Sequence, residues 1–117
     1  MNRTVIKVVA LMNAREGMSA AEFSHHWKTV HNRIVWQLPG LVRYVQNHAT
    51  AHSEEWPYDG MAELWFETKR DVAIAFSSPQ AEPMREDEKK FIGRMQWFLV
   101  DELEMVNPSL TPSTGSQ

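Results

Sequence analysis

The chain has 117 residues, enough for one domain around a single hydrophobic core and too few for two. Its 12 lysines and arginines against 15 acidic residues give a net charge of -3, so we expect no nucleic-acid partner, because such binders carry a basic surface. It has no cysteine, which excludes disulfides, thiolate metal sites and cysteine nucleophiles.

An apolar run near the N-terminus, residues 5–12, is interrupted by Lys7 and is followed by no small-residue cleavage site. We interpret it as a strand rather than as a signal peptide. No run approaches the roughly 20 apolar residues that span a bilayer. We therefore expect a cytoplasmic protein that does not bind membranes.

The first two predicted elements are a strand and a long helix. Residues 4–12 are mostly β-branched or apolar on both faces, which predicts a central strand covered on both sides. Ser19 and Glu22 have the spacing of a capping box, so a helix is predicted from residue 20 to residue 38. A helical wheel places four apolar residues on one buried stripe of this helix, namely Phe23, Trp27, Val30 and Ile34.

Three histidines lie on this predicted helix. The wheel places His26 and His31 on opposite edges of the apolar stripe, while His25 points toward water. A histidine at such an edge can reach a cavity and exchange a proton near neutral pH, or it can be a half-buried side chain bonded to a backbone carbonyl. Because His26 and His31 are five residues apart rather than three or four, we expect no metal site.

Two strands follow the Pro-Gly turn that ends the helix. Residues 41–48 predict a strand with Tyr44 and His48 on one face and Asn47 on the other. Residues 61–68 predict another strand of the same sheet.

The rest of the chain predicts a second helical region and a last strand. The helical region covers residues 69–92 with an interruption at Ser-Ser-Pro, and its charged run MREDEKKF is interpreted as a solvated face. Residues 95–106 predict the last strand. Residues 107–117 are expected to form a flexible tail outside a single domain of residues 1–106.

The order of elements is β-α-β-β-α-β, which predicts an α+β, ferredoxin-like sandwich with both helices on one face of a four-stranded antiparallel sheet. The other face, which carries Met61 and Trp65, is too apolar to be exposed to water. We expect a homodimer to bury it, with ionic pairs among Lys7, Arg43 and Glu63. A small-molecule ligand would then bind between the sheet and the helices.

Several segments carry a resemblance to a known family: GMSAAEFSHHWKTVH, LPGLVRYVQNH, YDGMAELWF, DEKKFI and a last strand that ends in VDE. Together and in this order they resemble the EthD family of small dimeric α+β barrel proteins. The resemblance covers nearly all of residues 5–102. It implies ferredoxin-like units paired face to face, and relatives that include decarboxylases, dehydratases and methylmuconolactone isomerases needing no metal or organic cofactor.

The resemblance also implies a site. In the isomerases, a histidine late in the first helix and a tyrosine of the next strand lie in the pocket. Through the shared PGL sequence these correspond to His31 and Tyr44. The isomerases have a cysteine where this chain has Leu64, so the same isomerisation is not expected.

The sequence therefore predicts a cofactor-independent lyase or isomerase that acts by acid–base chemistry on a small, apolar, aromatic or polyketide-like metabolite. We assign His31 as the general acid or base with His26 as its rival, and Tyr44 as the hydrogen-bond donor to a substrate oxygen. A non-catalytic carrier of the same fold and a cofactorless monooxygenase are the alternatives. Further candidate substrate-binding residues, of which the last three have core or interface packing as the alternative role, are Asn47, His48, Trp65, Phe91 and Trp97.

Overall fold

The order of strands and helices is the predicted one. The computed structural model describes residues 6–51 and 55–110, so the predicted start of the first strand at residue 4 and the tail beyond residue 110 lie outside the described residues. The elements are β1 (Ile6–Ala14), α1 (Ala20–His26), η1 (Trp27–His31), α2 (Asn32–Val35), β2 (Arg43–His48), β3 (Gly60–Phe66), α3 (Lys69–Ser77), α4 (Ala81–Phe91) and β4 (Ile92–Asp101).

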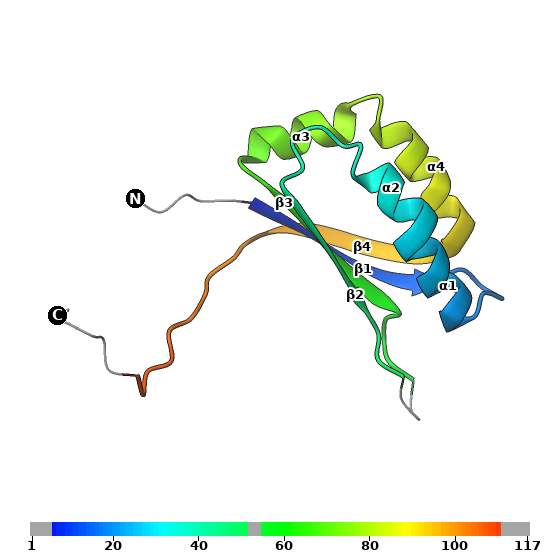
Figure 1. Cartoon of the computed structure of the whole chain (residues 1–117), viewed down its shortest axis with the longest axis horizontal. Helices are drawn as coiled ribbons and strands as arrows, with labels where there is room; N and C mark the ends of the chain where they lie inside the picture. The colour runs from blue at the N-terminus through cyan, green and yellow to red at the C-terminus, as the bar shows by residue number, and fades with distance from the viewer. Residues whose placement is uncertain (1–5, 52–54, 111–117) are drawn as a thin grey trace.

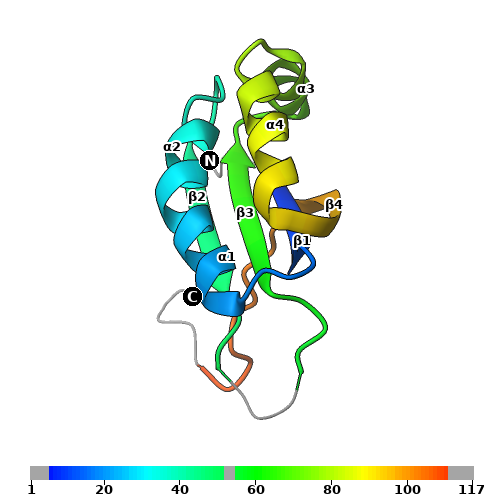
Figure 2. The same ribbon diagram turned by 90° about the vertical axis from the view of Figure 1, so that its right-hand side faces the viewer.

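The four strands form one antiparallel sheet in the order β2-β3-β1-β4, with β1 in its interior as predicted. All helices cover one face of this sheet (Figure 1), and the α1–α2 helix lies beside α4 (Figure 2). The fold is therefore the predicted α+β, ferredoxin-like one. Leu64 pairs with Val8 on one side and with Tyr44 on the other, so these three side chains share the face that the helices cover.

Large aromatic side chains fill the space between the two layers. Those that are almost completely buried are Phe23, Trp27, Phe66 and Phe91. Removing such a side chain from water contributes about 1.5–3 kcal/mol, so this cluster stabilises the attachment of both helices to the sheet.

The first helix departs from its predicted wheel at η1, a π-helical turn. The N–H of Asn32 bonds the carbonyl of Trp27, five residues back, so the turn holds one residue more than an α-helical turn. The predicted stripe is wrong at Val30, because this extra residue rotates the rest of the helix, whereas Ile34 is partly buried and packs against the core as predicted. Val30 is 46% exposed, whereas His31 and Val35 are buried.

Other boundaries also differ from the prediction, among them the start of β4 at Ile92 rather than at residue 95 and the ends of the first helix and of β4. The first helix ends at Val35 and continues as a turn to residue 38. β4 ends at Asp101 rather than at residue 106, because Asp101 pairs with Ile6 and no described strand lies beyond that pair. The following residues run away from the domain as an extended arm (Figure 1).

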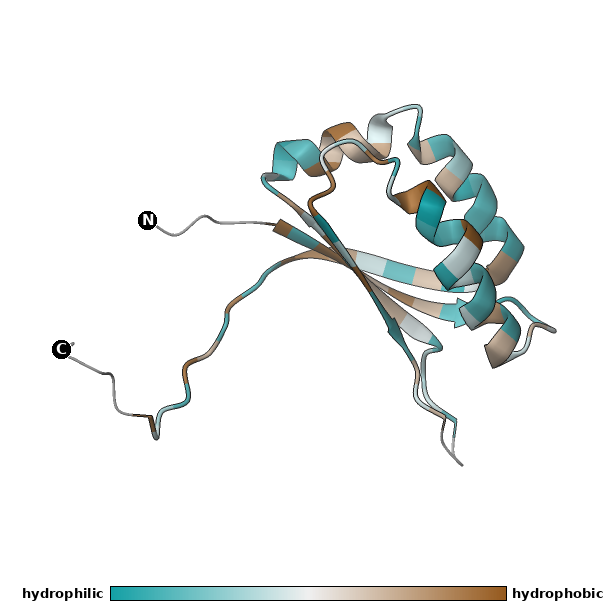
Figure 3. Ribbon diagram, viewed as in Figure 1, coloured by the Kyte–Doolittle hydropathy of each residue, from teal (hydrophilic) through white to brown (hydrophobic). Residues whose placement is uncertain are grey.

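The sheet face away from the helices carries apolar side chains, among them Val9 and Trp65, which are nearly buried, and Phe98, which is 53% exposed. Exposed hydrophobic residues also occur along the C-terminal arm, where brown segments alternate with teal ones in Figure 3. Among the described residues, no helix is long and apolar enough to cross a membrane.

Candidate active site

A cavity of about 170 Å³ lies between the helices and the sheet. A cavity of similar size, about 150 Å³, holds benzene in another protein, so this one has room for a single ring. Most of its lining is apolar and includes Val8, Met12, Leu64, Phe76, Met84 and Met95. Four ionisable side chains lie in this apolar wall, a combination typical of ligand sites: His31, Tyr44, Arg85 and Glu88.

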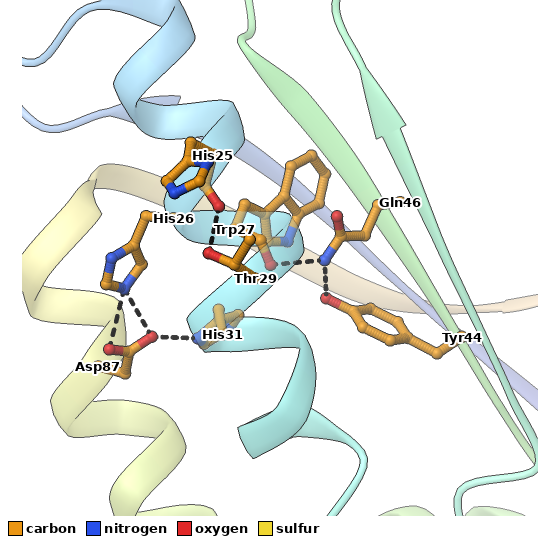
Figure 4. Close-up of polar contacts among 8 residues, drawn as sticks. All are labelled: His25, His26, Trp27, Thr29, His31, Tyr44, Gln46 and Asp87. Carbon is orange, nitrogen blue, oxygen red and sulfur yellow. Dashed lines mark hydrogen bonds and ion pairs between the residues drawn. The ribbon is translucent and has the colours of Figure 1, made fainter.

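A buried carboxylate on α4 joins two histidines of the first helix. Nε2 of His26 lies 3.0 Å from both oxygens of Asp87, and Nδ1 of His31 lies 2.8 Å from Oδ2 (Figure 4). Asp87 is 2% exposed, and the ring of Phe91 packs against both imidazoles at centroid distances of 4.8 Å. The carboxylate therefore holds both rings in place, with His31 buried and the side chain of His26 22% exposed.

The expectation that five-residue spacing separates His26 from His31 is wrong. A π-helical turn repeats after more residues than an α-helical one, so η1 brings the two imidazoles to one carboxylate. Within residues 6–51 and 55–110, no cluster of three or more histidine, aspartate or glutamate side chains is arranged to hold a metal ion.

The hydrogen bond to Asp87 determines the tautomer of His31. A carboxylate only accepts hydrogen bonds, so the Nδ1–H of His31 donates to it and the neutral ring keeps its lone pair on Nε2. No described residue bonds that Nε2. Burial lowers the pKa of His31 below its ordinary value of 6.5, against the opposing effect of Asp87, so the neutral, basic form is favoured at neutral pH.

A second chain of hydrogen bonds orients the hydroxyl of Tyr44. Nε2 of Gln46 donates to the carbonyl of Trp27 at 2.9 Å and to the Tyr44 hydroxyl at 2.8 Å (Figure 4). Since that hydroxyl accepts from Gln46, its own proton is free to donate. Burial raises the pKa of Tyr44 to about 12, so the group remains a protonated donor at neutral pH.

The same chain continues to His48. The Oε1 of Gln46 faces Nε2 of His48 at 2.9 Å, which requires that nitrogen to carry a proton, and Nδ1 then accepts from the Ser24 hydroxyl at 2.7 Å. Burial and the nearby charge of Lys28 lower the pKa of His48, which favours this neutral form. His48 thus supports Tyr44 through Gln46, although it does not line the cavity.

Of the remaining candidate substrate-binding residues, some line the cavity and others lie away from it. Trp97 lines the cavity and stacks on Phe76 at a centroid distance of 6.3 Å. Phe91 is completely buried behind the histidines and does not line the cavity. Asn47 and Trp65 lie on the opposite face of the sheet, where the Asn47 amide bonds Glu63 and the Trp65 indole bonds Glu102.

Asp87 and Glu88 are the site residues that the sequence interpretation missed, because their charged run was interpreted as a solvated face. A usable signal was present. Ala81, Met84 and Phe91 form the apolar stripe of α4, and Asp87 lies on that stripe at helical spacing. An acidic residue at a core position of a helix is rare unless it is paired, so this position pointed to a buried partner.

Replacing Asp87 with asparagine tests the tautomers. The amide keeps the shape of the side chain, but its NH₂ group would face a histidine N–H, so one histidine must change tautomer or lose its bond. We expect the free energy of unfolding to fall by about 1–3 kcal/mol. Nitrogen-15 NMR of the imidazoles should show Nδ1–H at His31 and Nε2–H at His26 in the parent protein, and a changed tautomer in the variant.

The control is Glu86→Gln, an exposed neighbour on α4 that pairs with Lys89, which should leave both tautomers unchanged. An unaltered imidazole spectrum in the Asp87→Asn protein would contradict the assigned hydrogen bonds.

Three solved structures illustrate the fold relationship. An EthD family protein from Bacillus halodurans has 19% identity and a TM-score of 0.73, over 85% of this chain and 99% of that one. A dimeric ferredoxin-like protein of unknown function from Thermobifida fusca has 11% identity and a TM-score of 0.68, over 87% and 94%. SnoaB, a cofactor-independent oxygenase from Streptomyces nogalater, has 12% identity and a TM-score of 0.63, over 88% and 97%. At these identities the similarity shows the shared fold.

Sequence comparison identifies the family. No curated protein matches the chain significantly. The EthD domain, however, matches residues 15–94, which is well over half of the chain. The matched range includes His26, His31, Tyr44 and Asp87. The chain therefore belongs to the EthD domain family.

Proposed function

We propose that the protein is a cofactor-independent lyase or isomerase that moves a proton on a small one-ring substrate. The observation that carries this proposal is the convergence of a base and a donor on one apolar cavity. The base is Nε2 of His31, whose other nitrogen is held by Asp87, and the donor is the Tyr44 hydroxyl.

The first step is removal of a proton next to a carbonyl of the substrate. Nε2 of His31 takes the proton, and the electron pair of the broken bond moves onto the carbonyl oxygen, which the Tyr44 hydroxyl stabilises. Asp87 stabilises the imidazolium that forms, because its carboxylate accepts the Nδ1–H bond. The buried setting of all three groups strengthens these interactions relative to water.

The second step decides the reaction class. If the imidazolium returns its proton to a different substrate atom, the result is an isomerisation. If the negative charge expels a leaving group such as hydroxide, which takes up the proton as water, the result is a dehydration. Decarboxylation uses the same groups in the reverse order: loss of carbon dioxide leaves an enolate that Tyr44 stabilises, and an imidazolium at His31 supplies the proton.

Substitution of the two groups tests the mechanism. His31→Gln keeps a polar side chain of similar size but removes the base, so turnover should fall by about 10²–10⁴-fold. Tyr44→Phe removes the donor and should lower turnover by about 10²–10³-fold. Conversion of one-ring hydroxylated carbonyl compounds is followed by liquid chromatography and mass spectrometry. His25→Gln is the matched control, since His25 is exposed on the same helix. Full activity in His31→Gln would refute the assignment.

The pH dependence of kcat/KM gives an independent prediction. His31 must be neutral to act as the base, and burial lowers its pKa below 6.5, so activity in the direction that begins with proton removal should be lost on the acid side of pH 6.5. Tyr44, with a pKa of about 12, should add no alkaline limb at neutral pH. A pH–rate profile that rises toward acid would show that the imidazolium is the starting form, as in decarboxylation.

Two other functions would use the same cavity. A carrier would bind a ring compound tightly and release it unaltered after long incubation. A cofactor-independent oxygenase, the activity of the structurally similar SnoaB, would form product only in the presence of dioxygen. Parallel incubations with and without oxygen therefore separate all three functions.

The proposed functional unit is a homodimer that buries the sheet face away from the helices. On that face Nζ of Lys7 bonds Glu63 at 2.9 Å, and the guanidinium of Arg43 lies 4.3 Å from the Trp65 ring centroid. Lys7 and Glu63 thus neutralise each other within one chain, whereas Arg43 makes a cation–π contact with Trp65. The apolar Phe98 and the exposed arm remain for a second copy, and the Thermobifida fusca protein of the same fold is dimeric.

Sedimentation velocity tests the dimer. The parent protein should sediment at about twice its chain mass of 13.6 kDa. Phe98→Glu should weaken association at least about a hundredfold, because burying an unpaired charge costs several kcal/mol. Ile74→Glu is the control, because Ile74 is 48% exposed on α3, on the other side of the sheet. A monomeric parent protein, or equal dissociation of both variants, would exclude this interface.

A further inference from the structure

One carboxyl group of α4 has no hydrogen-bond or ion-pair partner in the part of the chain that the structure describes. The helix carries four acidic residues, and three of them are paired: Glu82 with Arg85, Glu86 with Lys89, and Asp87 with the two histidines. Glu88 makes no side-chain hydrogen bond or ion pair with any residue that the structure describes. It is nevertheless half-buried and lines the cavity.

The nearest cation does not neutralise it. Arg85 lies one helical turn before Glu88, but its guanidinium bonds Glu82 at 3.5 Å and the backbone carbonyl of Phe76. Burial raises the pKa of Glu88 to about 7, with Arg85 lowering it and Asp87 raising it further. From the facing elements, His31 and Tyr44 line the same cavity, and the charge of Glu88 contributes to the raised pKa of Tyr44.

We propose that Glu88 binds a hydroxyl group of the ligand, so that the ligand is a ring with at least two oxygen substituents. One is the carbonyl that faces Tyr44, and the other is the hydroxyl that donates to Glu88. This inference rests on the proposed use of the cavity as a ligand site. An unpaired, half-buried carboxyl group in an apolar cavity is typical of a binding or catalytic position rather than of a structural one.

The charges around the cavity favour a hydroxyl over an ammonium group as the partner of Glu88. Arg85 lies on the same wall and would repel a ligand cation, whereas it leaves a neutral hydroxyl unaffected. A hydroxyl also suits Glu88 in both of its protonation states, because it can donate to the carboxylate and accept from the neutral acid. Ammonium binds only the ionised form.

Calorimetric titration of simple ring ketones tests the proposal. The probes are acetophenone and its 2-, 3- and 4-hydroxy isomers, because the position of the hydroxyl that reaches Glu88 depends on the ring's orientation. In the parent protein, at least one isomer should bind about tenfold more tightly than acetophenone, which corresponds to about 1.4 kcal/mol. In Glu88→Leu this gain should fall below about threefold, by the same relation.

The control is Glu86→Gln, which should keep the full gain, because Glu86 is exposed and does not line the cavity. An equal gain in Glu88→Leu, or no gain for any isomer in the parent protein, would overturn the proposal. Tighter binding of 3-(aminomethyl)acetophenone than of every hydroxy isomer would also overturn it, in favour of a cationic ligand.

Thermal unfolding separates a binding role from a structural one. Because the pKa of Glu88 is raised from 4.5 to about 7 on folding, the contribution of this group to the stability of the parent protein falls as the pH rises from 4.5 through 7. Glu88→Gln should remove this loss and unfold at a higher Tm than the parent above pH 7. A lower Tm for Glu88→Gln at that pH would indicate a structural role and overturn the proposal.

The binding test of Glu88 can succeed or fail independently of the catalytic mechanism proposed for His31. If the hydroxylated probes bind through Glu88 but His31→Gln leaves turnover unchanged, the acid–base mechanism fails and the binding role of Glu88 stands. If His31→Gln abolishes turnover and Glu88→Leu keeps the hydroxyl preference, the mechanism stands and the role of Glu88 fails.

Discussion

The π-helical turn η1 determines the geometry of the whole site. Its extra residue brings His31 to the carboxylate that His26 already contacts, and it directs Val35 rather than Ile34 fully into the core. In the same segment of the helix, the Thr29 hydroxyl donates to the backbone carbonyl of His25 at 2.5 Å (Figure 4). Turns of this kind occur frequently at functional sites because they reposition side chains without ending a helix.

The two carboxyl groups that follow each other on α4 have opposite energetic roles. Asp87 is fully buried but accepts hydrogen bonds from two imidazoles, so its desolvation is offset and it holds α4 to the first helix. Glu88 is half-buried without such bonds, so it destabilises the folded chain when ionised. If Glu88 binds a ligand as proposed, this loss of stability follows from keeping the group unpaired in the free protein.

The features that the sequence predicted correctly are those that follow from the periodicity of strands and helices and from turn-forming residues. Strand alternation placed Tyr44 and Asn47 on opposite faces of the sheet, and the helical wheel placed His25 in solvent, as the structure has them. The convergence of His26 and His31 could not be predicted, because a wheel assumes α-helical geometry throughout. Asp87 was missed for a different reason: alternating charge indicates a solvated face only where no partner on another helix satisfies one of the charges.

The hydrogen-bonding roles of His31 and Tyr44 in the cavity are determined by two acceptors, the Asp87 carboxylate and the backbone carbonyl of Trp27. The carboxylate of Asp87 can only accept, so His31 must present an acceptor to the ligand. The carbonyl of Trp27 can only accept, so Gln46 must direct its NH₂ group to Tyr44, which then presents a donor. Both assignments follow from atoms that have a single hydrogen-bonding role, and neither depends on the ligand. In the proposed mechanism, the cavity is therefore preorganised for a substrate that gives a proton on one side and accepts a hydrogen bond on the other.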